Sequence, residues 1–310
     1  MRCLVTGGAG FIGSHLVEHL LKNQHEVVVL DDFSSGKLEH LPAASGHLQI
    51  VRGSILDQPL TEKVMQNKDW VFHLAGLASV QASMEDPMTS HAVNATGTLQ
   101  ILWAAKRAGV LRVVYAASSS AYGNVDRPMQ SETDPLRPCS PYAAAKLAGE
   151  LYSQAFTAGL QLPCVRLRFF NVYGPRQDMK SPYSGVIARF ANLMSRGERP
   201  TIFGDGLQSR DFVYVADVCA ALVAAAQKPW SADQSNGELV YNIGTGHGTN
   251  LLELVHHLNT LLSRQLQPIF APAREGDIRR SCANIHKAQT ELGYQPRVDL
   301  RSGLQKTLGL

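Results

Sequence analysis

The sequence places a tyrosine and a lysine four positions apart, at Tyr142 and Lys146. Side chains at this spacing share one face of a helix. An ammonium beside a phenol favours the phenolate, and so lowers the pKa of the tyrosine from its usual value of about 10. We therefore expect Tyr142 to act as a general base toward a hydroxyl group. Many tyrosines at this spacing only pack, so the pair needs support from other residues.

Three consecutive serines, Ser118, Ser119 and Ser120, supply that support. They directly follow a β-prone run, residues 112–117. If this run is a strand of a parallel sheet, the hydroxyl groups lie at its carboxyl edge, where ligands bind in such folds. The serines and Tyr142 could then meet at one substrate.

A glycine-rich turn near the N-terminus indicates a dinucleotide site. Gly7, Gly8, Gly10 and Gly13 satisfy both GxGxxG and GxxGxxG, between a β-prone run at 2–6 and residues at helical spacing. Glycines there permit a tight turn, close approach of a pyrophosphate and packing of helix against strand. The amino end of the helix favours the phosphates.

Asp31 favours NAD over NADP. It ends the second predicted strand, 18 residues after Gly13, where a carboxylate in such a fold holds a ribose diol and would repel a 2′-phosphate. Asp32 is the alternative, either as the ribose ligand or as a simple turn residue. A positively charged nicotinamide ring would lower the pKa of Tyr142 further.

The supporting elements alternate along the first half of the chain. Helical stretches are expected around 97–106 and 142–156, and strands at 2–6, 27–30, 48–51, 70–74, 112–117 and 164–167. This alternation predicts an α/β fold of the Rossmann type, a doubly wound parallel sheet covered on both faces. After about residue 170 the alternation is lost. We expect an NAD-binding domain at 1–170 and a smaller mixed α/β lobe for the substrate at 171–310, with some later segments returning to the first domain.

The composition excludes several classes of function. A net charge of +3, with 45% hydrophobic and 18% charged residues, is that of an ordinary globular protein. The basic residues are scattered, so no nucleic-acid or membrane surface is expected. No signal peptide and no apolar run of roughly 20 residues is visible, which favours the cytoplasm. The spacing of the cysteines and histidines favours neither a disulfide framework nor a metal site.

Five segments, which follow one another along the chain in the order of the family's motifs, resemble the extended short-chain dehydrogenases/reductases of the NAD-dependent epimerase/dehydratase family. They are TGGAGFIG, YAASSSAYG, SPYAAAK, RFFNVYGPRQ and GDGLQSRDFVYV. The resemblance spans essentially the whole chain and is strongest to the UDP-hexose and UDP-N-acetylhexosamine 4-epimerases. It implies inversion at C4 through a 4-keto sugar, with Tyr142 as the base and Lys146 as its partner. Ser118 would be the catalytic hydroxyl, and its neighbours Ser119 and Ser120 could share that task. NAD would stay bound, because the net redox change is zero.

The resemblance also implies a set of cofactor contacts. Ser54 and Ile55 would flank the adenine, although Ser54 replaces a residue that is often acidic in the family. The expected set is Gly7, Gly10, Phe11, Ile12, Gly13, Asp31, Asp32, Phe33, Ser34, Lys37, Ser54, Ile55, Leu74, Ala75, Gly76, Asn94, Tyr142, Lys146 and Phe170.

A second set is implied for the UDP-sugar. Two arginines, Arg210 and Arg274, would hold the phosphates, since forked guanidinium groups suit phosphate oxygens; a salt bridge to Asp211 is the alternative for Arg210. The full set is Asn171, Arg210, Arg274 and Asp277 for the diphosphate and its surroundings, Val186, Thr201 and Phe203 for the uracil, and Ala78, Ser79, Ser118, Ser119, Ser120, Tyr142, Gln177, Gly185 and Ser281 for the sugar.

Ser281 bears on the choice of sugar. Glucose-restricted epimerases place a tyrosine at the matching position, and serine leaves room for an N-acetyl group at C2. We therefore expect a UDP-GlcNAc/UDP-GalNAc 4-epimerase, serving polysaccharide biosynthesis, with some activity on UDP-glucose and UDP-galactose. A surface serine without a role is the alternative.

Two other functions stay open. A nucleotide-sugar dehydratase or decarboxylase would share the fold, but such enzymes usually carry an acid pair where this chain has Ser119 and Ser120. A non-catalytic NAD-binding regulator would have no need of a base such as Tyr142.

The family further implies a homodimer. Its two-fold interface would be built from the helices around 97–106 and 142–156. Leu99, Ile101 and Leu102 are expected to provide an apolar face beyond what the sheet needs.

Overall fold

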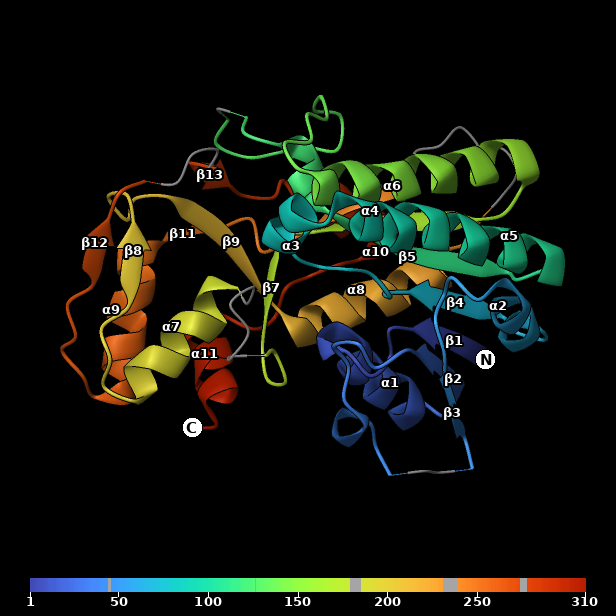
Figure 1. Cartoon of the computed structure of the whole chain (residues 1–310), viewed down its shortest axis with the longest axis horizontal. Coiled ribbons are helices and arrows are strands. Elements are labelled where there is room, and N and C mark those ends of the chain that lie inside the picture. The colour runs from blue at the N-terminus through green and yellow to red at the C-terminus, as the bar shows by residue number, and fades with distance from the viewer. Residues whose placement is uncertain (44–45, 126, 179–184, 231–238, 274–277) are drawn as a thin grey trace.

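The computed structural model describes residues 1–43, 46–125, 127–178, 185–230, 239–273 and 278–310. These residues form a large part around one parallel sheet and a smaller part beyond one end of that sheet (Figure 1). The smaller part lies at the left of the view, and the helices and strands that build it come from the second half of the sequence.

The main sheet has seven strands, all parallel, in the order β10-β6-β5-β4-β1-β2-β3. The predicted Rossmann-type α/β fold is confirmed. The central strands are buried along nearly their whole length, as expected for a parallel sheet covered on both faces. The strands are β1 (Arg2–Thr6), β2 (Glu26–Asp31), β3 (Leu48–Arg52), β4 (Trp70–His73), β5 (Arg112–Ser118), β6 (Cys164–Phe169) and β10 (Val240–Ile243).

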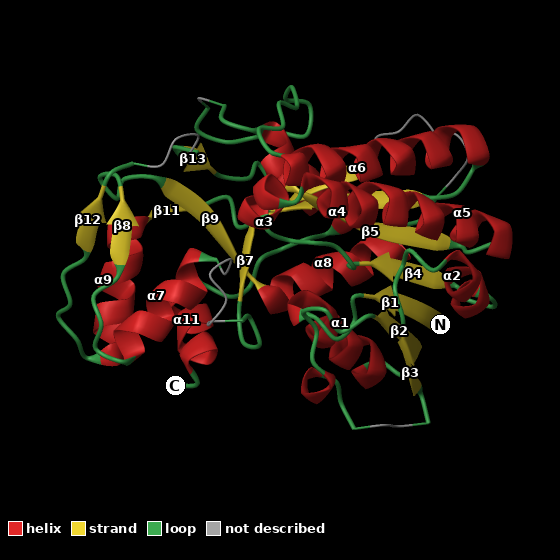
Figure 2. Cartoon of the chain, viewed as in Figure 1, coloured by secondary structure: helices red, strands yellow, loops and turns green. Residues whose placement is uncertain are grey.

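Helices cover the two faces of this sheet (Figure 2). One layer contains α1 (Phe11–Lys22) and α8 (Val215–Gln227), which pack together, with α10 (His286–Leu292) beside α8 and β10. The other contains α2 (Gln58–Met65), α5 (Thr98–Ala108) and α6 (Pro141–Leu160). The short elements are α3 (Val80–Glu85), α4 (Pro87–His91), a π-helical turn η2 (Ala92–Gly97), and the 3-10 turns η1 (Leu38–His40) and η3 (Ser119–Tyr122).

The smaller part is organised around β9 (Ser209–Tyr214). This strand pairs with β7 (Asn171–Tyr173), β11 (Gly248–Asn250) and β13 (Arg280–Ser281), while β8 (Thr201–Phe203) pairs with β12 (Ile269–Ala271). The helices of this part are α7 (Val186–Ser195), α9 (Leu251–Leu262) and α11 (Leu300–Leu308).

The chain crosses between the two parts more than once. The main sheet takes its edge strand β10 and its covering helix α8 from beyond residue 170. A division into 1–170 and 171–310 stays a prediction.

We expected Leu99, Ile101 and Leu102 to form an apolar outer face on the helix around 97–106. This prediction is wrong for Ile101 and Leu102. Ile101 and Leu102 are fully buried, and they pack with Leu4 and Val71 in the core beneath α5. The sheet therefore needs these side chains. Exposed apolar side chains do occur on the outer sides of α5 and α6, where Trp103 is 47%, Leu151 55% and Tyr152 40% exposed.

Candidate active site

A cavity of about 280 Å³ lies where β5 and β6 end, between the main sheet and the smaller part. Parallel strands end at a common edge, and ligands bind at that edge in doubly wound folds. Residues that the sequence analysis assigned to catalysis or binding meet on its wall: Ala78, Ser118, Ser119, Ser120, Tyr142, Phe170, Asn171, Arg210 and Ser281.

Tyr142 reaches this wall because α6 begins beside it. Ser140 caps the helix, its hydroxyl accepting from the amide of Ala143 at 3.1 Å, and Pro141 occupies the first helical position. The amide of Tyr142 donates to the hydroxyl of Ser83 at 3.0 Å. This bond ties the amino end of α6 to α3 and holds Tyr142 at the cavity.

Ser118 is the last residue of β5 and caps the turn η3. Its hydroxyl oxygen accepts from the amide of Ser120 at 3.2 Å and from the Ser120 hydroxyl at 2.8 Å. Ser118 and Tyr142 both line the cavity, and the hydroxyl of Ser118 lowers the pKa of the phenol. Ser120 supports Ser118.

Burial governs the ionisation of Tyr142 and Lys146. It raises the pKa of Tyr142, and the nearby hydroxyl of Ser118 counteracts only part of that rise. It lowers the pKa of Lys146 to about 7, with the Nζ atom 4.6 Å from the centroid of the Tyr115 ring. A lowering of the pKa of the phenol by Lys146 together with a nicotinamide ring stays a prediction.

The glycine turn has the tight packing that its motif predicts. Gly7 has a φ of +68°, and a Cβ atom on Gly13 would lie 2.1 Å from the carbonyl oxygen of Gly7. Gly10 is the residue before α1, and no side chain caps this helix. The first amides of α1, at Phe11 and Ile12, are thus left to a ligand, and an uncapped helix end favours phosphate. These features fit the pyrophosphate of NAD.

Asp31 and Asp32 differ in their surroundings. Asp31 is buried, and its carboxylate accepts from the amides of Ala9 and Phe33, each at 2.8 Å. It therefore lies against the glycine turn. The exposed Asp32 accepts from the amide and the hydroxyl of Ser34, at 2.9 and 2.6 Å. These are the contacts of a turn residue, so Asp31 is the better-placed ribose ligand.

Most of the other expected cofactor residues follow β2, β3 and β4, while Asn94 lies in η2 and Phe170 follows β6. The amide of Lys37 donates to the carbonyl of Ala9 at 3.0 Å, and the amide of Ala75 donates to the hydroxyl of Thr6 at 3.2 Å. Asn94 exchanges hydrogen bonds with the backbone of Leu77, at 3.0 and 3.2 Å. Cofactor contacts stay predictions for Phe33, Ser34, Lys37, Ser54, Ile55, Leu74, Ala75, Gly76, Asn94 and Phe170.

Arg210 and Asp211 point in opposite directions because adjacent residues of a strand face opposite sides. Arg210 lines the cavity, where its guanidinium donates to the carbonyls of Ser209 and Ile278 at 2.9 and 2.6 Å. The buried Asp211 carboxylate accepts from the backbone and hydroxyl of Thr245, at 2.8 and 2.7 Å. This geometry favours a ligand role for Arg210 over a salt bridge with Asp211.

Ser281 lies on the cavity wall at the end of β13, which pairs with β9. The buried Gln130 holds this segment in place. Its Oε1 atom accepts from the amide of Cys282 at 2.8 Å, and its backbone exchanges further bonds with Cys282 and Asn284, both at 2.8 Å. The position of Ser281 supports a contact with the sugar rather than a surface role.

Several expected substrate residues lie elsewhere. Ser79 caps α3, with its hydroxyl accepting from Ala82 at 3.0 Å. A Cβ atom on Gly185 would lie 3.2 Å from Nε2 of Gln177. Substrate roles stay predictions for Ser79, Gln177, Gly185, Val186, Thr201 and Phe203, which are not among the residues that line the cavity. Arg274 and Asp277 lie outside the described residues.

Sequence reasoning missed part of the wall. Tyr122, Val80 and Arg280 line the cavity and are direct neighbours of motif residues, so the motifs could have signalled them. Gln130 carries no such signal, because it lies in an aperiodic loop and meets its partners more than a hundred residues away in sequence.

Other features limit the chemistry. Among the described residues no group of histidine, cysteine and carboxylate side chains is arranged to hold a metal ion. All five cysteines are free. Within the same residues, the helices are too short or too polar to cross a membrane.

Comparison with known proteins agrees with the geometry. Residues 3–244 match the model of the NAD dependent epimerase/dehydratase family. A UDP-glucose 4-epimerase of Mycolicibacterium smegmatis is 41% identical over 99% of this chain and 97% of its own length. Two solved structures superpose with TM-scores of 0.93: a UDP-glucose 4-epimerase of Thermotoga maritima with UDP-glucose, and a UDP-N-acetylglucosamine 4-epimerase of Methanobrevibacter ruminantium with UDP-N-acetylmuramic acid. The first is 38% identical and covers 100% of this chain and 98% of that one; the second is 36% identical and covers 99% and 97%.

The family model matches most of the chain, and a relative is similar in sequence along nearly its whole length. The glycine turn and the Tyr142–Lys146 pair are consistent with this match. This chain belongs to the NAD-dependent epimerase/dehydratase family and is an enzyme that uses NAD.

Proposed function

We propose that this protein inverts C4 of a UDP-hexose and accepts N-acetylated hexosamines. The observation that carries the proposal is the phenol of Tyr142, beside Ser118, in a cavity whose described wall has no carboxylate. With NAD to accept and return the hydride, a phenol base and a hydroxyl suffice for oxidation and reduction at one alcohol carbon. The named relatives support this assignment, since UDP-sugar 4-epimerases cover nearly the whole chain.

The same wall disfavours elimination of water or carbon dioxide. Dehydration needs an acid near C5 and C6 of the sugar. The positions after Ser118, where such an acid is expected, are Ser119 and Ser120, and both face the cavity. Hydroxyl groups with ordinary pKa values do not supply that acid. A non-catalytic regulator is disfavoured as well, because it would have no need of a base such as Tyr142 at the cavity.

The chain's own residues would divide the work as follows. Tyr142 removes the proton of the 4-hydroxyl, and Ser118 holds the same oxygen and orients it. Arg210 retains the diphosphate, so that the 4-keto sugar turns over without leaving the cavity. Tyr142 then returns the proton to the inverted alcohol, which makes the cycle neutral in protons.

NAD would be held by the glycine turn, by Asp31 at a ribose and by Lys146 at the nicotinamide ribose. When bound, NAD supplies a hydride acceptor at C4 and a positive charge near the phenol. That charge would offset the burial that raises the pKa of Tyr142 in the polypeptide.

The first test follows the product by NMR after incubation with UDP-GlcNAc or UDP-glucose. We expect the C4 epimer to form from both, with no net change in the amount of either the oxidised or the reduced cofactor. Tyr142→Phe removes the base while keeping the ring, so kcat should fall by about 100-fold or more with little change in sugar affinity. A 4-keto or pentose product, or near-normal turnover by Tyr142→Phe, would contradict the assignment.

The second test concerns cofactor choice. Asp31→Ala removes the buried carboxylate beside the glycine turn, and should weaken NAD binding and relax discrimination against NADP. The measurement is the dissociation constant of each dinucleotide by calorimetry. Asp32→Ala is the matched control, because that carboxylate contacts Ser34 and not the turn. Equal effects of the two variants would refute the role of Asp31.

Sugar choice rests on Ser281. Several relatives are named for UDP-glucose and one for UDP-N-acetylglucosamine. The small side chain of Ser281 on the cavity wall supports acceptance of the larger sugar. We therefore propose UDP-GlcNAc/UDP-GalNAc as the preferred pair, with UDP-glucose/UDP-galactose as a second substrate and polysaccharide biosynthesis as the pathway served.

The third test replaces Ser281 by Tyr. Tyrosine is about 100 Å³ larger than serine, close to the volume of an acetamido group, and packed protein does not yield easily. The ratio of kcat/KM for UDP-GlcNAc to that for UDP-glucose should fall at least tenfold. Ser281→Ala keeps the space open and should leave the ratio nearly unchanged. An unaltered ratio in Ser281→Tyr would show that this residue does not face the sugar.

The exposed apolar side chains of α5 and α6 support a homodimer, the assembly that the family implies. Between α2, α5 and α6 lies a groove of about 320 Å³ lined by Leu99, Trp103 and Phe156 among others. We propose that a second copy covers this face about a two-fold axis.

Free cysteines and scattered charge support a cytoplasmic enzyme.

The fourth test is light scattering at micromolar concentration, where the dimer mass is expected. Trp103→Glu places a charge in the proposed interface and should give a folded monomer. Phe270→Glu is the matched control, because Phe270 is 57% exposed on β12 of the smaller part. A monomeric wild type, or dimers that survive Trp103→Glu unchanged, would refute the interface.

A further inference from the structure

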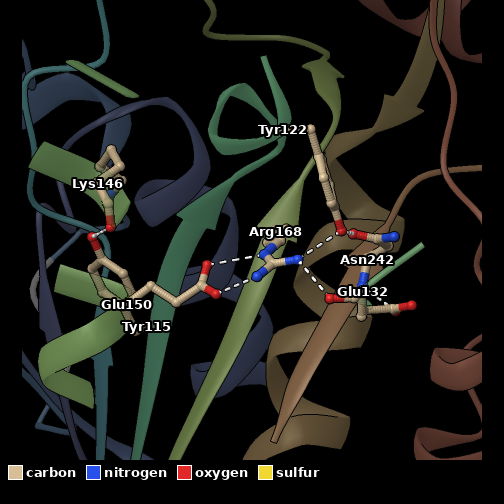
Figure 3. Close-up of polar contacts among 7 residues, drawn as sticks. All are labelled: Tyr115, Tyr122, Glu132, Lys146, Glu150, Arg168 and Asn242. Carbon is tan, nitrogen blue, oxygen red and sulfur yellow. Dashed lines mark hydrogen bonds and ion pairs between the residues drawn. The ribbon is translucent and has the colours of Figure 1, made fainter. Parts of the chain in front are cut away.

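A chain of buried polar side chains links α6, β6, η3 and β10 (Figure 3). It runs from Glu150 on α6 through Arg168 on β6 to Tyr122, the last residue of η3, and on to Asn242 on β10. The Glu150 and Arg168 side chains are 7% and 4% exposed. The mechanism above uses none of these groups.

The guanidinium of Arg168 is the centre of this network. Its Nε and Nη2 atoms donate to the two carboxylate oxygens of Glu150, the first at 3.0 Å. Its Nη1 atom donates to the hydroxyl of Tyr122 at 2.8 Å and to the carbonyl of Glu132 at 3.3 Å. The Tyr122 hydroxyl in turn donates to Oδ1 of Asn242 at 2.7 Å. Each donor thus has a fixed direction, as the planar guanidinium requires.

Two members of the network, Glu150 and Tyr122, belong to the elements that hold the expected catalytic groups. Glu150 follows Lys146 by four residues and Tyr142 by eight, so the three lie on one face of α6. Tyr122 closes the turn η3, which begins directly after Ser118. The position of α6 relative to η3 decides whether Ser118 reaches Tyr142.

Stability alone explains this arrangement poorly. A buried ion pair loses its hydration, and an apolar pair of similar volume is often as stable or more so. A forked guanidinium that bonds two partners at fixed angles does supply geometry, which an apolar contact does not.

We propose that Glu150, Arg168 and Tyr122 are positioning residues, which hold α6 against η3 so that Ser118 and Tyr142 stay together at the cavity. This role rests on the proposed function for its meaning, but it has a readout that needs no substrate. The hydroxyl of Ser118 lowers the pKa of Tyr142. If the turn loosens, that hydroxyl lies farther from the phenol and the pKa of the phenol rises.

The test variant is Tyr122→Phe. It removes the hydroxyl shared by Arg168 and Asn242 but keeps the ring, its packing and the Glu150–Arg168 pair. Tyr294→Phe is the matched control, since the Tyr294 hydroxyl is also buried and makes a hydrogen bond to the carbonyl of Gly244 at 2.8 Å. Both variants should lose similar stability in a denaturant titration, so any further difference reports position.

The measurement is an ultraviolet titration of tyrosinate, taken as the difference between each protein and its Tyr142→Phe version. The difference isolates Tyr142, while Lys146 and Tyr115, which also lie near it, are unchanged in every variant. We expect the midpoint to move to higher pH by about half a unit or more in Tyr122→Phe and not in Tyr294→Phe. Arg168→Lys, which keeps the charge but loses the fork, should move it in the same direction.

Turnover provides the second readout. With a UDP-hexose that the wild type converts, Tyr122→Phe should lower kcat about tenfold and leave KM within about twofold. Unchanged titration in Tyr122→Phe, or an equal shift in Tyr294→Phe, would overturn the proposal. If the wild type converts no UDP-hexose, the proposed function fails, and the titration still decides whether the network positions Tyr142.

Discussion

The parallel pairing of β5 with β6 is the constraint on which the candidate site depends. Its register sets Ser118 opposite Phe169, so both strands end at the same edge of the sheet. Because α6 joins these two strands, it runs antiparallel to them and begins at that edge. Tyr142, in the first turn of α6, is thereby brought to Ser118. A slip of this register would separate the phenol from the hydroxyl and turn each side chain of β6 to the other face.

Burial at this edge of the sheet disfavours the charged forms of the ionisable side chains there. The pKa of Tyr142 is raised and that of Lys146 is lowered to about 7, both because burial disfavours the charged form. His73, behind the site, has its pKa lowered to about 3 and is held neutral between Thr6 and Thr98. Among the buried charged groups, Glu150 and Arg168 pair with each other, while the Asp211 carboxylate accepts hydrogen bonds from Thr245. The polypeptide thus holds the phenol of Tyr142 in its protonated form, and a cationic cofactor would favour the phenolate.

The substrate side of the cavity is built from strands and loops of the smaller part rather than from the edge of the main sheet. β9 holds Arg210 toward the cavity and Asp211 toward the opposite side, where backbone amides surround its carboxylate. β13 and Gln130 then place Ser281 on the wall. These contacts join segments that are far apart in sequence. The shape of the sugar site is consequently a property of how the two parts meet rather than of one motif.

Local patterns in the sequence were sufficient for the Rossmann fold, the glycine turn and the approach of Tyr142 to Ser118, because each depends on short spacing or on the common edge of parallel strands. Only the tertiary structure decided three other features. They are the return of β10 to the main sheet, the burial of Ile101 and Leu102, and the hydrogen bond between Gln130 and Cys282. The rise in the pKa of Tyr142 belongs with them. Periodicity records which residues are apolar but not how much of each is covered, and both burial and the pairing of remote segments arise only when the whole chain packs.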